Sequence, residues 1–227
     1  MAVTLSSVVP WGRTMAEYTL MFDLSERDLD GRILGCGDGP ASFNAEMTRL
    51  GRRVTSVDPI YSLSRPQIEQ RVAETYDPII SQCKANLGNY VWSFFSDPDD
   101  LGRHRLAAMR TFIDDLDRGL AEGRYLTQEL PSLDFADAEF DLALCSHLLF
   151  LYTEQLSLEF HVEAIKEMCR VAQEVRIFPI LDLKVRKSAH IESLLPRLEE
   201  SALTVEIVRV PYEFQRGGDE MMKIRKQ

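Results

Sequence analysis

The sequence predicts a doubly wound α/β fold, in which helices cover both faces of a largely parallel sheet. Short apolar, β-branched segments alternate along the chain with stretches whose apolar residues recur at helical spacing. A glycine-rich turn follows the first such segment, and Gly217 and Gly218 separate the last two extended segments. We therefore expect a seven-stranded sheet that ends in an antiparallel hairpin, with ligand sites at the carboxyl ends of its strands.

The stretch 32–61 is predicted to form a strand, a turn, a helix and a second strand. The first strand ends at Leu34, and the three glycines within 35–39 allow a tight turn with close backbone approach to a ligand. The helix stops at Gly51, and the second strand leads to Asp58. A carboxylate at that strand end is placed to accept hydrogen bonds from ribose hydroxyls, so the unit is suited to an adenosine-like ligand.

A short helix capped by Thr14 and ending near Leu24 precedes this unit. Just before it, Trp11 and Arg13 allow two interpretations. One is a buried tryptophan beside a solvated arginine, and the other is contact with a ligand or its carboxylate.

About 70 residues separate Asp58 from Glu129, several times the length of one crossover helix. The pattern predicts two helices there, the first kinked or broken at Pro78 and the second starting at Asp97. The apolar stripe expected on the second helix consists of Leu106, Met109, Ile113, Leu116 and Leu120. We interpret 61–122 as a helical cap inserted into a single domain that spans 1–227. The aromatic residues of this cap either pack it onto the sheet or line an acceptor pocket. They are Tyr76, Tyr90, Trp92, Phe94 and Phe95.

The rest of the chain continues the alternation. The nearly unbroken apolar run 140–145 is typical of the buried centre of a parallel sheet. The other expected elements are strands at 125–127, 175–178, 204–210 and 221–224, and helices at 154–171 and 188–200.

Composition excludes several classes of function. With 36 acidic and 26 basic residues the net charge is -10, and the absence of a basic cluster argues against a nucleic-acid partner. Cys36, Cys83, Cys145 and Cys169 show no CxxC spacing, so we expect neither disulfides nor a metal site. No apolar run approaches the ~18 residues of a membrane span. Because the N-terminus also lacks the features of a secretory signal, we expect no membrane partner and a cytoplasmic location.

A dinucleotide site is the first alternative to test, because glycine turns after strands also bind nicotinamide and flavin cofactors. The GxGxxG spacing fails in both registers, since Pro40 or Ser42 stands where the third glycine belongs. Asp58 suits either kind of cofactor, so the glycine spacing decides against a dinucleotide.

The loop 35–41, Asp58, the phrase 133–142 (LDFADAEFDL) and the terminal hairpin together resemble a known family. The class I S-adenosylmethionine-dependent methyltransferases carry a D/E-x-G-x-G-x-G loop after the first strand and an acidic residue at the end of the second. They also carry a phrase like LPFPDGSFDLV before the fourth strand. The resemblance covers nearly everything except 61–122, and it implies a Rossmann-like fold with S-adenosylmethionine as the cofactor.

The loop matches the family in two registers. The preferred one puts Gly35 in the acidic position and Ala41 at the last glycine, which leaves Gly51 and Asp58 at the usual distances. The other matches all three glycines and puts Ile33 in the acidic position. Either way a carboxylate near the methionine end is missing, and Arg13 or Asp38 is the expected replacement.

The resemblance also implies positions for the cofactor. Asp58 would hold the ribose, Pro59 or Ile60 would flank the adenine, and the residues after the fourth strand would face the sulfonium. The cofactor-binding residues it implies are Gly35, Cys36, Gly37, Asp58, Pro59, Glu129, Leu130, Cys145 and Ser146.

Methyl transfer is an in-line displacement, so the protein mainly positions and desolvates the reactants, and a base is needed only for protonated nucleophiles. His147, just past the fourth strand, is the candidate catalytic base, against the alternative of a structural histidine. Trp11, Arg13, Phe150 and Tyr152 are the expected substrate-binding residues.

The leading hypothesis is therefore a methyltransferase for a small-molecule acceptor. The alternative is a catalytically silent S-adenosylmethionine-binding sensor or partner subunit, which the missing acid supports. A protein acceptor stays open as a third hypothesis, and the sequence makes no prediction about oligomeric state.

Overall fold

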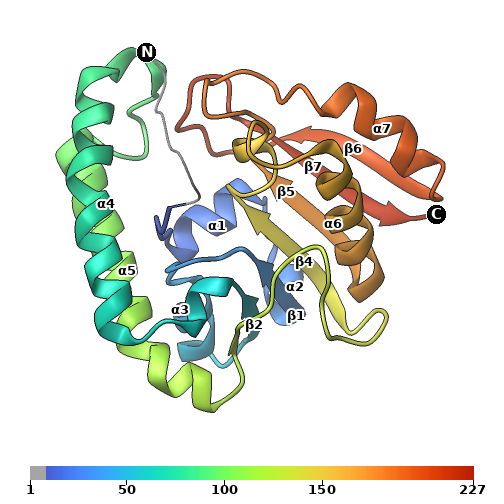
Figure 1. Ribbon diagram of the computed structural model, residues 1–227, viewed down its shortest axis with the longest axis horizontal. Helices are drawn as coiled ribbons and strands as arrows, with labels where there is room; N and C mark the ends of the chain where they lie inside the picture. The colour runs from blue at the N-terminus through green and yellow to red at the C-terminus, as the bar shows by residue number, and fades with distance from the viewer. Residues whose placement is uncertain (1–8) are drawn as a thin grey trace.

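The computed structural model describes residues 9–227, which adopt the predicted doubly wound α/β fold (Figure 1). One seven-stranded sheet has the order β3-β2-β1-β4-β5-β7-β6. β7 is antiparallel to both β5 and β6, whereas the other paired neighbours are parallel, so the predicted sheet with its antiparallel C-terminal hairpin is confirmed. The strands are β1 Arg32–Cys36, β2 Arg53–Val57, β3 Tyr125–Leu126, β4 Phe140–Ser146, β5 Ala172–Phe178, β6 Leu203–Arg209 and β7 Glu220–Lys226.

Helices cover both faces of this sheet. In Figure 1, α1, α3, α4 and α5 lie on one side, and α6 and α7 lie on the other. Both faces of β1 are therefore buried, with Ile33 packed against the α1 and α3 side and Leu34 against the α6 side. The helices are α1 Met15–Met21, α2 Glu26–Asp30, α3 Phe43–Arg49, α4 Arg65–Ala85, α5 Pro98–Ala121, α6 Leu158–Val171 and α7 Ile191–Glu199. Short 3-10 turns are η1 Pro59–Ser62, η2 Leu87–Asn89 and η3 Phe150–Tyr152.

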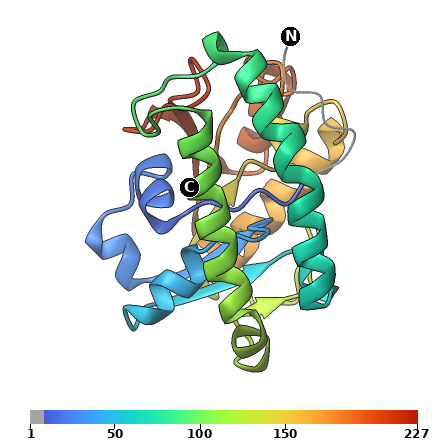
Figure 2. The ribbon, with the colours of Figure 1, turned by 90° about the vertical axis from the view of Figure 1, so that its left-hand side faces the viewer.

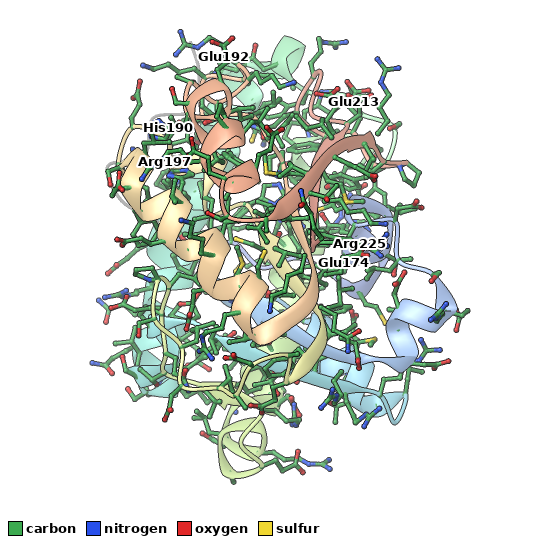
Figure 3. The ribbon with its side chains drawn as sticks, turned by 90° about the vertical axis from the view of Figure 1, so that its right-hand side faces the viewer. Glu174, His190, Glu192, Arg197, Glu213 and Arg225 are labelled. Atoms are coloured by element: carbon green, nitrogen blue, oxygen red, sulfur yellow. The ribbon has the colours of Figure 1, made fainter. Side chains whose placement is uncertain are left out.

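The antiparallel strand β7 is held to β5 by charge as well as by its backbone ladder. Glu174 and Arg225 are register partners on the two strands, and Arg225 Nε donates to Glu174 Oε2 at 2.5 Å. Figure 3 shows the two side chains next to each other on this side of the sheet. Opposite charges placed directly across an antiparallel pair stabilise that pairing.

Helix α4 runs without interruption through Pro78, so the predicted break is wrong. A proline inside a helix removes the hydrogen bond to the carbonyl four residues earlier. Pro78 and Glu74 are both exposed, so water can solvate the freed carbonyl. Ile79 and Ile80 continue the buried face directly after the proline, and this packing carries the helix onward.

Helix α5 begins where the sequence predicts, because the Asp97 side chain accepts a hydrogen bond from Asp100 N at 2.7 Å. Its buried face differs from the predicted stripe. Phe112 and Arg105 are fully buried, whereas Leu120 is exposed. The helix turns this face toward the sheet domain and α4, and Leu120 lies beyond both.

Two other helices begin later than predicted. Helix α6 starts at Leu158 because Ser157 Oγ accepts from Phe160 N and caps it, and the preceding residues form η3 and turns. Helix α7 starts at Ile191 instead of near Ser188, whose Oγ bonds to Thr153 Oγ1 at 2.7 Å.

The chain leading into α1 passes beneath the pair of long helices. Figure 2 shows α4 and α5 side by side, with this segment running across behind them. Trp11 packs against clusters contributed by both helices. We call residues 9–13 the strap.

The aromatic residues of the predicted cap pack among themselves and against the loop after β6. Tyr90 stacks on Phe214 with ring centroids 4.8 Å apart, and Phe95 meets the same ring edge-on at 5.5 Å. Phe94 contacts Tyr212 at 5.5 Å. These contacts join 86–97 to 211–218, as the packing interpretation of the sequence requires.

A buried ion pair joins α1 to α5. Glu17 and Arg105 are almost completely inaccessible to solvent, and two hydrogen bonds of 2.5 and 2.6 Å connect them. Tyr212 Oη, from the loop after β6, donates to the same carboxylate at 2.9 Å. Burial by itself raises the pKa of Glu17, but the charge and hydrogen bonds of Arg105 outweigh it, so the pKa lies below its usual value.

Within residues 9–227, none of the helices combines the length and apolar character that crossing a bilayer requires. The same part of the chain contains no group of histidine, cysteine or acidic side chains arranged to hold a metal ion. All four cysteines are free and buried. The expectation about a secretory signal concerns the N-terminus, most of which, residues 1–8, lies outside the described residues.

We predict that Glu17→Gln lowers the free energy of unfolding by about 3–5 kcal/mol, because it leaves the Arg105 charge buried without a counter-ion. Urea denaturation followed by circular dichroism measures the change. Glu69→Gln, which removes an exposed ion pair with Arg65 on α4, is the matched control and should leave stability nearly unchanged. Equal losses for the two variants would contradict the structural role of the buried pair.

Candidate functional site

A cavity of about 540 Å³ opens at the carboxyl ends of the parallel strands. Its wall is formed by the residues that follow four of them, which are 37–41 after β1, 58–60 after β2, 128–130 after β3 and 146–148 after β4. The strap and part of α4 close other sides. In open α/β sheets, ligands bind in the crevice outside this edge.

The glycine turn forms the floor of the cavity. Gly37 and Gly39 have φ of +68° and +53°, which residues with a side chain rarely adopt, and Gly37 N donates to Val57 O at 2.9 Å. Ala41 is a buried core residue with no such requirement. The positions at which the structure requires glycine are therefore Gly35, Gly37 and Gly39. This favours the register that the sequence analysis did not prefer, in which Ile33 stands in the acidic position.

Asp38 supplies a carboxylate beside the glycine turn. A Cβ at Gly35 would lie 1.8 Å from Asp38 Oδ2, so the carboxylate occupies the space of the missing side chain. Tyr18 Oη donates to Oδ1 at 2.8 Å, and Ser56 Oγ donates to Oδ2 at 2.6 Å. Burial raises the pKa of Asp38 to about 6, although the bonds from Ser56 and Tyr18 oppose this. At neutral pH the group is mainly ionised and borders the cavity.

Asp58 follows β2 and faces the same cavity. Its Oδ2 accepts from Gly39 N and its Oδ1 from Ile60 N, both at 2.8 Å. Burial nevertheless raises the pKa of Asp58, with nearby Glu129 acting in the same direction. The backbone thus fixes the carboxylate while the remaining lone pairs of both oxygens are free to accept hydrogen bonds from a ligand.

The predicted adenine-side residues also line this cavity. Pro59 and Leu130 contribute apolar surface, and Glu129 lies at the exposed rim. Ile60, with which the sequence analysis paired Pro59, is part of the same wall.

His147 lies in the cavity wall directly after β4. Its backbone has φ of +53°, a conformation that costs a residue with a side chain about 1–2 kcal/mol, and its N donates to Phe178 O at 2.7 Å. The imidazole Nδ1 is 2.9 Å from Ser146 Oγ. Burial, together with the positive charges of Arg13 and Arg105, lowers the pKa of His147 well below its usual value. The ring is therefore neutral at physiological pH, and its lowered pKa makes it a weaker base than a free imidazole.

The strap forms the opposite wall and brings Trp11 and Arg13 to the cavity. Gly12 packs so closely on the glycine turn that a Cβ there would lie 2.0 Å from Pro40 O. Arg13 O accepts a hydrogen bond from Ser42 N at 3.0 Å. These contacts fix the strap to the loop that carries Asp38.

Five predicted site residues do not line the cavity, contrary to the expectation from sequence: Gly35, Cys36, Cys145, Phe150 and Tyr152. Cys36 and Cys145 are partners in the β1–β4 register, and both side chains enter the core beneath α6. Phe150 belongs to that core as well. Tyr152 lies behind the strap and accepts a hydrogen bond from Val9 N at 3.2 Å.

Several side chains of the wall were not predicted from the sequence. Among them is Tyr18, whose polar role comes only from its pairing with Asp38. Arg71 on α4, and Leu156 and Phe160 near the start of α6, carry no local motif. Their place in the wall depends on tertiary packing.

The chain has the fold of the class I S-adenosylmethionine-dependent methyltransferases. It can be superposed on the mitomycin 7-O-methyltransferase MmcR with a TM-score of 0.50 and 13% sequence identity, over 94% of this chain and 54% of that one. It therefore spans about half the length of MmcR. A search also finds magnesium protoporphyrin IX methyltransferase from Synechocystis PCC 6803, with a TM-score of 0.45 and 16% identity over 89% of this chain and 73% of the other.

The chain belongs to the same family as the uncharacterized protein MJ0045 from Methanocaldococcus jannaschii. The two sequences are 33% identical over 225 residues, which is 99% of each chain. No protein-family model matches the chain.

We predict that Gly35→Ala destabilises the protein by about 1–3 kcal/mol, because the new methyl group overlaps the Asp38 carboxylate and forces it out of its bonds with Tyr18 and Ser56. Urea denaturation measures the loss. Gly88→Ala is the control, since a Cβ there meets open space. A Gly35→Ala protein as stable as the Gly88→Ala protein would show that the carboxylate is not packed as described.

Proposed function

We propose that the protein is an S-adenosylmethionine-dependent methyltransferase that acts on a small-molecule acceptor. The observation that carries the proposal is the pairing of Asp58 with the glycine turn across one cavity, at the edge of the sheet where this fold accommodates its ligands. One magnesium protoporphyrin IX methyltransferase structure of this fold contains S-adenosylmethionine, and a second contains S-adenosylhomocysteine. The failed dinucleotide spacing of the glycines supports the same cofactor.

In this proposal the cofactor lies along the carboxyl ends of β1, β2 and β4. Asp58 accepts hydrogen bonds from the ribose hydroxyls, while Pro59, Glu129 and Leu130 surround the adenine. Gly37 admits the methionine portion, because only a residue without a side chain leaves room beside Leu148. The Asp38 carboxylate provides the negative charge that the family's motif places at its acidic position and that this chain lacks there.

The described cavity also suggests how Gly35, Cys36 and Cys145 serve such a site. These residues do not line the cavity themselves. They are buried behind its floor, and in this proposal they support the neighbouring residues that contact the cofactor. Ser146 remains in the wall, next to His147.

Residues 61–122 are proposed to act as a helical cap over the acceptor. Ser62, Leu63 and Arg71 from this stretch line the cavity, and Trp11 of the strap packs beneath its two long helices. Apolar walls with few polar groups suit a small organic acceptor. The net charge of -10 makes a nucleic-acid acceptor unfavourable.

His147 is proposed as the base that takes a proton from the acceptor. The methyl group is already activated by the sulfonium, so the chain's contribution is to align the nucleophile, exclude water and remove that proton. The support for this role is position: the imidazole lies in the wall, held by its backbone bond to Phe178, and is in its neutral, proton-accepting form, although its lowered pKa makes it a weak base.

We predict that isothermal titration detects binding of S-adenosylmethionine and none of NADH. Asp58→Asn should weaken the affinity by about tenfold or more, because the amide lacks the charge and half of the acceptor capacity. Asp117→Asn, an exposed substitution on α5 with the same change of charge, is the control and should bind as the wild type does. Tight NADH binding without heat from S-adenosylmethionine would refute the cofactor assignment.

We predict that His147→Ala lowers turnover by about 10²-fold or more while leaving S-adenosylmethionine affinity unchanged. Turnover is measured as S-adenosylhomocysteine formation with a small-metabolite extract as the source of acceptor. The exposed α5 substitution His104→Ala is the matched control. Unchanged turnover in the His147 variant would remove the base hypothesis.

The same assays separate this proposal from a catalytically silent cofactor-binding sensor or partner subunit. Cofactor binding with no methyl transfer to the extract or to a broad acceptor panel would favour the silent protein. The catalytically silent alternative is supported by the absence of an acidic residue in the family's acidic position, where this chain has Ile33 or Gly35. The Asp38 carboxylate, which lies beside Gly35, weakens that argument.

A further inference from the structure

Arg13 is a half-buried cation in the cavity wall, and it forms no ion pair within residues 9–227. Its Nη1 donates to Trp11 O at 3.1 Å, and its buried Nε has no hydrogen-bond partner among residues 9–227. Other arginines in protected positions are paired, as Arg105 is with Glu17 and Arg176 with Asp28. A charged donor that is buried without an acceptor is destabilising. Arg52 and Arg105 also have one buried nitrogen without a partner, but both of these guanidiniums form ion pairs. Of the three arginines, Arg13 alone has no carboxylate partner among residues 9–227, and it lines the cavity, where a ligand can supply one.

The position of Arg13 is fixed from both sides along the chain. On one side, the close contact of Gly12 with Pro40 and the bond from Ser42 N to Arg13 O hold its backbone against the glycine turn. On the other side, Thr14 caps α1 through a reciprocal pair of hydrogen bonds with Glu17, which Arg105 anchors. The guanidinium is thus presented to the cavity by a rigid segment.

The charge of Arg13 persists at physiological pH. Burial and the neighbouring Arg105 lower its pKa to about 10, which still leaves the guanidinium protonated at pH 7. The Arg105 charge is already neutralised by Glu17. The end of the cavity near Arg13 and His147 therefore has a positive charge that no described residue balances by an ion pair.

We propose that Arg13 binds a carboxylate group of a ligand in this cavity through its guanidinium. The planar guanidinium matches the two carboxylate oxygens and forms paired, charge-assisted hydrogen bonds with them. A doubly charged phosphate is less suited, because Asp38 and Asp58 line the same cavity and would repel it.

Two ligands of the proposed reaction can supply this group, so the inference rests on the proposed function. One source is the carboxylate at the methionine end of the cofactor, and the other is a carboxylate on the acceptor. In the first case Arg13 contributes to cofactor affinity. In the second it selects acidic acceptors, for which Trp11, Leu148 and Leu156 provide apolar walls.

Isothermal titration of the wild type, Arg13→Met and Arg110→Met distinguishes these cases. Arg110 is exposed on α5 and serves as a control for the change in net charge. The probes are S-adenosylhomocysteine, 5′-methylthioadenosine, which lacks the amino-acid portion, and benzoate added to protein saturated with S-adenosylhomocysteine. A further variant, Arg13→Lys, keeps the positive charge but loses the planar guanidinium group. Circular dichroism verifies that each variant is folded.

A cofactor carboxylate at Arg13 predicts that Arg13→Met weakens S-adenosylhomocysteine binding by about tenfold or more, with 5′-methylthioadenosine unaffected. An acceptor carboxylate predicts unchanged binding of both nucleosides and loss of benzoate binding in Arg13→Met. In either case Arg13→Lys gives a smaller loss, and Arg110→Met behaves as the wild type.

The inference is overturned if the wild type and Arg13→Met bind all three probes alike, or if Arg13→Met weakens both nucleosides equally. Failure of the proposed function gives a different result. The wild type would then bind neither nucleoside, and Arg13-dependent binding of benzoate to the free protein would show that the carboxylate site exists on its own.

Discussion

The buried ion pair between Glu17 and Arg105 holds together segments that are far apart in the sequence. It connects the start of α1 to the middle of α5, and Tyr212 adds the loop after β6 to the same carboxylate. Because neither charge can be left alone in the interior without a large loss of stability, the three segments are constrained to stay together. This constraint fixes the strap against the glycine turn and keeps α5 over the sheet domain. The cavity wall on the side of Arg13 depends on it.

Most of the fold is predictable from the sequence because its signals are local. The apolar run of β4, the β-branched segments and the glycines at turns predict the strands, and the Asp97 cap predicts the start of α5. The failures arise where tertiary packing overrides a local rule. Pro78 lies inside α4 because its face is exposed and the isoleucines after it are buried. The predicted α5 stripe is wrong at Leu120, which is exposed, and it omits Arg105, a charged residue that takes a core position through its partner Glu17.

The candidate site is predictable only where chain order fixes geometry. Asp58 and His147 each follow a parallel strand, and such strands end at one edge of the sheet, so the sequence alone brings these residues together. Side-chain direction is harder to predict: Cys36 and Cys145 belong to the right strand ends but turn into the core. Asp38 and Tyr18 come together through a contact between a helix and a turn that no motif encodes. This chain lacks the family's acidic residue at Ile33, and in our proposal the Asp38 carboxylate, which fills the space beside Gly35, replaces it.

The resulting account is of a cavity with separate regions along one sheet edge. In the proposed function, Asp58 marks the ribose end, the glycine turn and Asp38 form the middle, and His147 with Arg13 form the end proposed for methyl transfer. A crystal structure of the protein with S-adenosylhomocysteine tests this arrangement most directly. The account predicts ribose hydroxyls within hydrogen-bond distance of the Asp58 carboxylate and a sulfur atom facing His147. A nucleoside bound elsewhere, or bound with its ribose away from Asp58, would contradict it.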